Sequence, residues 1–387
     1  MTVPAQVITS SDPESFAHGV LAKRHPALIE QVGDAFPFGP GQRGALEALR
    51  EEGADGLVSP LDICAPDRDI WARWGNGCFG RSWFDVPFLW AESYFYRRLL
   101  GAVGYFDPGP WQGVDPFAPF KRAELRSAAV EEELAALDRL PELTRQQQEV
   151  TLLRSSLWGN RADLGFRITA ADAPQAQPDA GLVADDGDRL WQWLTADPPG
   201  RVAIVADNAG RELIPDLVLI DHLLDQGYAA DVVLHVKPYP YYVSDATLSD
   251  VLDCLHRLLR APGRARQIGR RLWDALGGGR LRVSTHPFFC APLPFAEVPD
   301  DLRQQFHEST VTVFKGDLNY RRLVGDRLWA ATTPFSEVTA YFPGRVAALR
   351  TLKCDVVVGL EPERVAALER SGQPWRTAGT HALVQCR

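Results

Sequence analysis

The chain has 387 residues, 45% of them apolar, and its 50 acidic and 41 basic side chains give a net charge of −9. This negative charge argues against a general nucleic-acid binder, and the absence of any run of 18 apolar residues argues against a membrane span. The length suits two domains or one elaborated domain.

The cysteines and the N-terminus indicate in which cellular compartment the protein works, and the histidines indicate which kind of metal site it could have. The six cysteines include no CxxC pair, so they indicate neither a disulfide framework nor a zinc signature and favour a reducing cytoplasm. The segment Met1–Gln6 lacks the basic region and the apolar region of a secretory signal, so none is expected. The eight dispersed histidines include no HExxH motif, so any metal is expected to have oxygen ligands.

Residues 1–170 are expected to form a helical N-terminal region. An aromatic-dense segment within it, 71–106, contains a predicted helix that carries Glu92 and Arg97. A buried ion pair between these two side chains is the favoured interpretation, and a position facing a substrate cleft is the alternative. Asn160 is a further polar residue amid apolar neighbours.

Between residues 171 and 200 the composition shifts to Ala, Asp, Pro and Gln, which is typical of a linker, although Leu190-Trp-Gln-Trp-Leu within it looks like a short helix. From 201 to 387, short apolar runs alternate with helical patterns, which predicts an α/β domain with a mostly parallel, helix-covered sheet. The predicted strands lie at 202–205, 232–236, 281–285, 311–314, 355–360 and 382–386, and two of the predicted helices lie at 248–259 and 264–276.

The stretch 201–213 carries the first polar cluster of this domain. A β-branched run is followed by Asp207 and Asn208, and then by a turn into an amphipathic helix. Open α/β sheets bind their ligands at the carboxyl ends of their strands, and hard divalent cations prefer oxygen ligands of this kind. The alternative is that Asp207 simply caps the helix that follows.

Three more polar clusters lie near predicted strands. The first ends in Ser244 and Asp245, which form either a helix cap or a ligand site. The second, residues 314–322, directly follows a strand and contains Lys315, Asp317, Asn319 and Arg321, for which a functional role is favoured over a solvated loop. The third ends at Lys353, just before the predicted strand 355–360.

These clusters combine acidic oxygen ligands with cationic groups, a division that suits metal-assisted phosphoryl chemistry. Neither a GxGxxG dinucleotide motif nor a GxxxxGK[ST] phosphate loop is present. The residues after Asp207 do not form the DxD motif of an aspartyl-phosphate phosphatase. The favoured nucleophile is therefore a metal-bound water.

Several motifs, taken in order, resemble the metal-dependent damage-control phosphatase family. They are Asp207-Asn-Ala-Gly-Arg-Glu-Leu, Val243-Ser-Asp-Ala-Thr, Lys315-Gly-Asp-Leu-Asn-Tyr-Arg and Arg350-Thr-Leu-Lys. The branch of the family that is also described as acidic-residue (protein-glutamate) methyltransferase is the most similar. Three upstream segments also resemble this branch: Trp83-Phe-Asp-Val-Pro, Glu92-Ser-Tyr-Phe-Tyr-Arg-Arg and Leu157-Trp-Gly-Asn. The resemblance therefore covers roughly residues 80–360.

The resemblance implies a doubly wound, three-layer αβα domain with a helical N-terminal region packed on it. It implies Mg²⁺, Mn²⁺ or a similar ion such as Co²⁺ or Ni²⁺, held by Asp207, Asn208 and Asp245. The implied substrates are small phosphorylated metabolites, including hexose phosphates such as fructose 1-phosphate. Phosphate contacts are expected from Lys353 and from the 315–321 loop, and the further candidates for substrate binding are Glu92, Arg97 and Asn160.

Two other functions stay open at this stage. A protein-glutamate methyltransferase that uses S-adenosylmethionine ranks second, because no glycine-rich loop that would cradle this donor is visible. A non-catalytic protein that binds phosphometabolites ranks third, because all three implied metal positions are intact. Two positions depart from the family pattern: Arg211 stands where a small or acidic residue is more common, and Cys354 follows Lys353.

Overall fold

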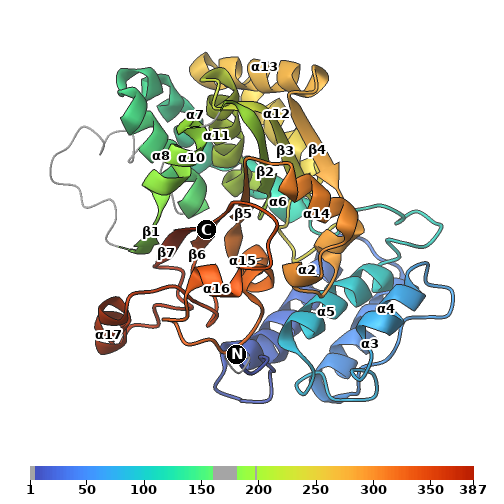
Figure 1. Cartoon of the computed structure of the whole chain (residues 1–387). Coiled ribbons are helices and arrows are strands. Elements are labelled where there is room, and N and C mark those ends of the chain that lie inside the picture. Colours follow the sequence, from blue (N-terminus) through green and yellow to red (C-terminus); the bar gives the residue numbers. More distant parts are fainter. Residues whose placement is uncertain (1–4, 160–180, 197) are drawn as a thin grey trace.

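The computed structural model describes residues 5–159, 181–196 and 198–387 (Figure 1). The expected N-terminal helices are present, and they surround the aromatic helix α5 (Phe88–Ala102), which is buried along most of its length. The other helical elements of this region are α1 (Phe16–Gly19), the π-helix η1 (Val20–Arg24), α2 (His25–Ala35), α3 (Pro40–Asp55) and α4 (Arg68–Trp74).

One mostly parallel sheet forms the rest of the framework, in the order β1-β7-β6-β5-β2-β3-β4. All neighbouring strands run parallel except β6 and β7, so β1 and β7 run opposite to the other five. The strands are β1 (Leu182–Asp185), β2 (Gly200–Val205), β3 (Ala229–Val236), β4 (Leu281–Thr285), β5 (Val311–Lys315), β6 (Val346–Thr351) and β7 (Ala382–Cys386).

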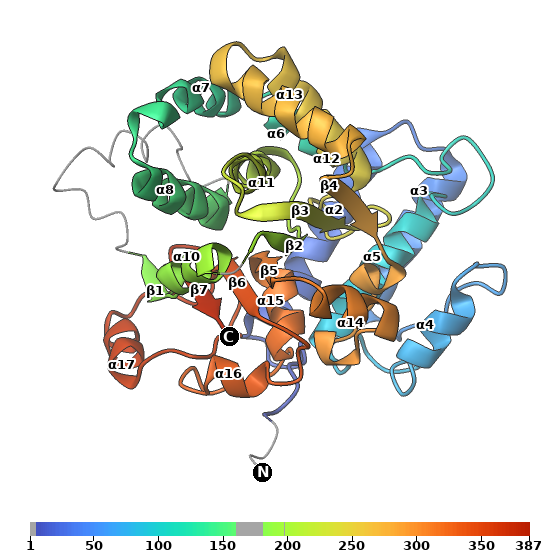
Figure 2. The same cartoon turned by 45° about the horizontal axis from the view of Figure 1, so that its top comes forward.

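Helices cover both faces of the sheet, which confirms the predicted α/β, three-layer class (Figure 2). Alternate β2 side chains serve opposite cores, since Val202 and Ile204 face one layer and Ala203 and Val205 face the other. The first layer contains α6 (Ala118–Leu125), α7 (Ala128–Ala136), η2 (Leu137–Glu142), α8 (Arg145–Trp158), α10 (Gly187–Ala196), α11 (Leu213–Asp225), α12 (Leu248–Arg260) and α13 (Gly263–Gly277). The second contains α14 (Asp300–His307), α15 (Gly316–Val324), α16 (Phe335–Val338) and α17 (Pro362–Arg370).

Two boundaries of the sheet domain differ from the sequence-based expectation. Helices α6 to α8 precede residue 170 but pack in the core of the sheet rather than with α1 to α5. The sequence predicts that the stretch 171–200 is a linker with a short helix at 190–194. The helix is present as α10, but the stretch also contributes β1, because Leu182, Val183 and the apolar face of α10 pack in the two cores. Residues 160–180, including Asn160, lie outside the described part of the chain.

The predicted strand at 355–360 is wrong, and β6 at 346–351 takes its place. Side chains and a loop satisfy the backbone of this buried segment instead of a neighbouring strand. Arg350 donates to Val356 O, Gln385 Nε2 donates to Val358 O at 2.7 Å, and Gly359 N donates to Thr333 O at 2.7 Å. The apolar pattern of a sequence predicts that a segment is buried, but it does not show which groups bond to the backbone of that segment. A buried β-branched run can therefore be mistaken for a strand.

Within the ranges that the structure describes, no helix is both long enough and apolar enough to cross a membrane.

The turn from β5 into α15 depends on Gly316. Its φ is +83°, in the left-handed region that favours glycine, and a Cβ added there would lie 1.9 Å from Asp207 Cγ. The close approach places the start of α15 directly against the end of β2. Any side chain at position 316 would therefore displace the Asp207 carboxylate.

We expect Gly316→Ala to lower the free energy of unfolding by about 1–3 kcal/mol more than the matched variant Gly227→Ala. Gly227 has a similar φ of +72° but no atom within 4 Å of its added Cβ, so it isolates the backbone strain from the steric clash. Urea-induced unfolding of both variants measures the difference. Equal destabilisation would show that the contact with Asp207 imposes no constraint.

Candidate active site

One cavity of about 360 Å³ lies where the N-terminal helices meet the carboxyl ends of the central strands. It is lined from both sides, so most of the candidate residues from distant parts of the sequence face the same space. From the N-terminal helices come Phe16, Val20, Arg24, His25, Leu28, Gln31, Glu92 and Tyr96, and from the sheet domain come Asp207, Asn208, Tyr242, Val243, Ser244, Asp245, Asp317, Leu318, Arg321 and Lys353.

The three candidate metal ligands are brought together by two backbone hydrogen bonds. Ala246 N donates to Asp207 O at 2.8 Å, and Ala209 N donates to Ser244 O at 2.6 Å. These bonds hold the loop after β2 beside the loop after β3. Neither carboxylate caps a helix: the turn after Asp207 has no side-chain cap, and α12 is capped by Thr247 and Asp250.

The carboxylates of Asp207 and Asp245 are electrostatically strained. Burial, and then the neighbouring Glu212 and Asp245 carboxylates, raise the pKa of Asp207 well above its usual value. Burial also raises the pKa of Asp245, against the opposing effect of Lys237, whose Nζ lies 3.3 Å from Asp245 Oδ2. A cation between the two carboxylates would relieve their repulsion.

The donor set fits a hard divalent cation. Asp245 Oδ2 is buried, and its partner among the described residues is Lys237 Nζ at 3.3 Å, which is long for a charged hydrogen bond, so a metal ion would share this oxygen with Lys237. No group of three or more His, Cys, Asp or Glu side chains in the described ranges could hold a metal ion. The candidate set is instead two carboxylates and the amide of Asn208, whose Oδ1 accepts a hydrogen bond from Ser244 Oγ at 2.7 Å.

Backbone strain adjoins this donor set. Tyr242 and Val243 have φ values of 45° and 64°, a conformation that is rare for any residue except glycine and most unusual for a β-branched one. Such conformations persist where the surrounding structure imposes them, and they gather at functional sites. Here the strained pair turns the chain so that Asp245 faces Asp207 while the Tyr242 ring stacks on Tyr96 at 4.6 Å.

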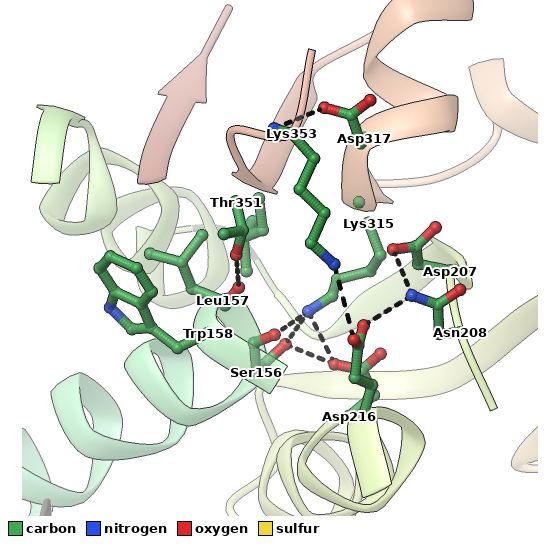
Figure 3. A pocket seen from close by; sticks show the side chains of 13 residues that line it. Ser156, Leu157, Trp158, Asp207, Asn208, Asp216, Lys315, Asp317, Thr351 and Lys353 are labelled. Carbon is green, nitrogen blue, oxygen red and sulfur yellow. Dashed lines mark hydrogen bonds and ion pairs between the residues drawn. The ribbon is translucent and has the colours of Figure 1, made fainter. Parts of the chain in front are cut away.

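A second, smaller pocket shares Asp207, Asn208, Asp317 and Lys353 with this cavity, so the site has two parts. Figure 3 shows the second part, which is lined by two lysines, Lys353 and Lys315. Lys353 is half-exposed, and its Nζ lies 3.8 Å from Glu212 Oε1. Lys315 is buried, where its Nζ donates to Ser156 Oγ at 2.7 Å and pairs with Asp216 Oδ1 at 2.9 Å. Lys353 is therefore the more accessible cation, and Lys315 is held by its partners.

Asp317 and Arg321 also line the cavity, each with fixed partners. Burial disfavours ionisation of Asp317, but the Arg350 and Arg321 guanidiniums outweigh it and lower the pKa of Asp317. Arg321 pairs with Glu92 at 2.6 Å on one side and with Asp326 at 2.7 Å on the other. These carboxylates occupy the Arg321 guanidinium, which leaves Lys353 better placed to meet an incoming anion.

The expected ion pair between Glu92 and Arg97 is wrong. Residues five apart in a helix point in different directions, so Glu92 faces the cavity while Arg97 pairs with Asp67 at 2.5 Å and lines a separate hollow. Asn319 lines neither part of the site. It is buried, and its amide donates to Ala206 O at 2.9 Å and to Lys315 O at 2.8 Å, which joins the ends of β2 and β5.

Some residues at the site were not singled out in the sequence. Asp216 is a buried carboxylate in the largely apolar first half of helix α11, and Glu212 accepts a hydrogen bond from Asn208 Nδ2 at 2.9 Å. Buried acids need partners, so an acid inside an apolar helical stripe is a usable signal. Lys237 directly follows β3, and a Pro/Tyr-rich loop separates it from Asp245. Their spacing in the sequence therefore does not indicate that the two side chains form an ion pair.

The two unusual positions have structural partners. Arg211 pairs with Glu133 of α7 at 2.5 Å, so its charge is compensated outside the donor set. Cys354 is buried, and its Sγ accepts a hydrogen bond from Arg350 Nη2 at 3.1 Å.

Comparison with known proteins identifies relatives along nearly the whole chain. A family model described as the damage-control phosphatase ARMT1-like domain matches residues 20–368. The protein named damage-control phosphatase ARMT1 in Rattus norvegicus is 30% identical, over 98% of this chain and 97% of its own. Its namesake in Bos taurus is 31% identical, over 100% of this chain and 99% of its own.

Among solved structures, a DUF89 family protein (ph1575) from Pyrococcus horikoshii is similar, with a TM-score of 0.50 and 13% identity. The match covers 91% of this chain and 93% of that chain, and at this identity it concerns the fold alone. The family model and the curated relatives confirm the resemblance that the motifs indicated. The chain belongs to the damage-control phosphatase ARMT1-like family.

Proposed function

We propose that this protein is a metal-dependent phosphatase that hydrolyses phosphomonoesters of small metabolites, with hexose phosphates such as fructose 1-phosphate as its substrates. Its relatives carry the name damage-control phosphatase. The observation that carries the proposal is the shared cavity of Asp207, Asn208 and Asp245 with the accessible cation Lys353. This arrangement offers ligands for a metal and a counter-charge for phosphate.

The proposed metal site consists of Asp207, Asn208 and Asp245, and its oxygen donors favour Mg²⁺, Mn²⁺ or a similar ion such as Co²⁺ or Ni²⁺. When bound, such an ion acts as a Lewis acid that polarises the phosphoryl group and activates the attacking water. Lys237 lies behind Asp245 and compensates part of its charge, while Ser244 fixes the orientation of the Asn208 amide.

The chain's cations would receive the phosphate. Lys353 is the half-exposed cation at the cavity wall, and Gly316 at the start of α15 lies beside it. Unpaired N–H groups at a helix N-terminus favour an anion, so the lysine and the start of α15 are proposed to bind the phosphoryl oxygens together. Lys315 is proposed to contribute its charge without touching the phosphate, because Ser156 of α8 and Asp216 of α11 hold its ammonium group.

The same cation argues against the methyltransferase alternative. S-adenosylmethionine carries a positive charge at its sulfur, which Lys353 would repel, and the sequence has no glycine-rich loop for this donor. A cytoplasmic location is part of the proposal. It is supported by the cysteines, which all lie in the described ranges and are all free thiols.

Phosphate release over a panel of phosphometabolites, with Mg²⁺, Mn²⁺, Co²⁺ and Ni²⁺ varied, tests the proposal. We expect release that depends on the metal and that inorganic phosphate inhibits competitively. Tight binding of S-adenosylmethionine in calorimetry, together with no phosphate release across the panel, would reverse the ranking of the two activities.

We expect Asp207→Asn to lower metal-dependent phosphate release by at least about 100-fold, because a proposed ligand loses its charge. The metal-free variant should melt no lower than the wild type, because a carboxylate repelled by Glu212 and Asp245 is gone. Thermal melts with and without Mn²⁺ measure both effects. Asp188→Asn, at an exposed position of α10, is the matched control. Wild-type turnover by Asp207→Asn would refute the assignment of Asp207 as a metal ligand.

Replacing Lys353 with Met should raise KM or lower kcat for fructose 1-phosphate by at least about tenfold, which corresponds to about 1.4 kcal/mol of lost stabilisation. The change keeps most of the side-chain volume and removes only the charge that faces the phosphate. Steady-state kinetics measure it, with Lys23→Met as the control because Lys23 is exposed and lines neither part of the site. Similar kinetics for the two variants would mean that Lys353 does not contact the substrate.

A further inference from the structure

Glu92 is a buried carboxylate that the phosphatase mechanism leaves without a task. It lies on α5 in the N-terminal helical region, only 6% exposed, and lines the cavity together with Asp207 and Asp245. A carboxylate this deeply buried is costly unless it is paired. A contribution to stability therefore does not explain why a carboxylate stands in the cavity wall, and a role in substrate binding would explain it.

Arg321 holds the Glu92 carboxylate in place. The guanidinium donates from Nη1 to Glu92 Oε2 at 2.6 Å and, from Nε and Nη2, to the two oxygens of Asp326 at 2.7 and 3.0 Å. The Phe88 ring lies 4.6 Å from the guanidinium carbon. The Asp326 carboxylate and the Phe88 ring thus fix the Arg321 guanidinium, and the guanidinium in turn fixes the Glu92 carboxylate.

Only one oxygen of Glu92 is used by the protein. Oε2 accepts from Arg321 and, at 3.4 Å, from the Tyr242 hydroxyl, whereas Oε1 has no hydrogen-bond partner among the described residues. The rings of Tyr96 and Tyr242 form the neighbouring wall. A charged acceptor with an unused oxygen, beside an aromatic wall, is suited to a neutral group that carries hydroxyl donors.

Glu92 reaches the cavity from a different part of the fold than the residues of the proposed phosphate site. Asp207, Asn208 and Lys353 come from the sheet domain, and Glu92 comes from the N-terminal helices on the facing side. A phosphate bound at Lys353 would project the rest of its molecule toward this facing wall. A second negative charge there would meet the Glu92 carboxylate and be repelled.

We propose that Glu92 selects the leaving group, because its free oxygen accepts hydrogen bonds from the hydroxyls of a neutral polyol such as a sugar and excludes a second anionic group. This role deepens the proposed phosphatase function and rests on it. Arg321 acts through Glu92 as a positioning residue. A site that hydrogen-bonds substrate hydroxyls discriminates strongly against analogues that lack them, because its buried polar group is then left unpaired.

The test compares kcat/KM for fructose 1-phosphate with kcat/KM for p-nitrophenyl phosphate, whose leaving group has no hydroxyl donors at its ring. In Glu92→Gln we expect the ratio of the two values to fall at least about tenfold, since the substitution keeps the shape and weakens the acceptor. The same variant should narrow the wild-type preference for fructose 1-phosphate over fructose 1,6-bisphosphate.

Asp221→Asn is the matched control, because Asp221 is also a buried carboxylate that pairs with an arginine, Arg271 at 2.5 Å, but it contacts neither Glu92 nor Arg321 and does not line the cavity. We expect its ratio to stay within about twofold of the wild type, although its melting temperature falls with the lost ion pair. A selective loss in Asp221→Asn as large as that in Glu92→Gln, or an equal loss with both substrates in Glu92→Gln, would overturn the inference.

The wild-type protein separates the two levels of the proposal. Release of phosphate from p-nitrophenyl phosphate without any preference for the sugar phosphate would overturn the role of Glu92 and leave the phosphatase function standing. No release from either substrate, at any metal tested, would overturn the proposed function and this inference together.

Discussion

The closeness of two carboxylates, the partly buried Asp207 and the buried Asp245, is the constraint around which the surrounding charges are arranged. Two backbone hydrogen bonds between the strand-end loops enforce it. Lys237 compensates Asp245 from behind, and Lys121 donates to the backbone oxygen of Asp245 at 3.1 Å. Like charges held together in a site of low dielectric are unfavourable without a counter-charge, so the arrangement makes physical sense as a cation site.

The fold was predictable where local sequence and tertiary structure agree. Apolar runs such as 202–205 and 311–314 became central strands, because strands buried on both faces need continuous β-branched sequence. Agreement failed at 346–351, where Ala347, Ala348 and the fully buried Arg350 do not look like a strand. Arg350 is tolerated there because Asp317 and two backbone carbonyls pair with its guanidinium.

The sequence allowed us to predict which residues belong to the candidate site, but not which acidic side chain pairs with which basic one. Strand-end position and chemistry singled out Asp207, Asp245 and Lys353, which the structure places in one cavity. Which acid pairs with which base depends on elements far apart in sequence. Glu92 and Arg321, 229 positions apart, are the clearest case, because no local pattern could have joined them. The roles of these residues remain predictions for experiment.

The position of β7 in the sheet has a consequence for how the chain is made. β7, formed by residues 382–386, lies between β1 and β6, and β1 pairs with no other strand. During synthesis from the N-terminus, β1 therefore has no partner until nearly 200 later residues have been added. The edge of β1 that later pairs with β7 stays uncovered for that time, although α8 and α11 already cover part of α10, so nascent chains that end before residue 382 expose an unpaired strand edge that a chaperone would shield.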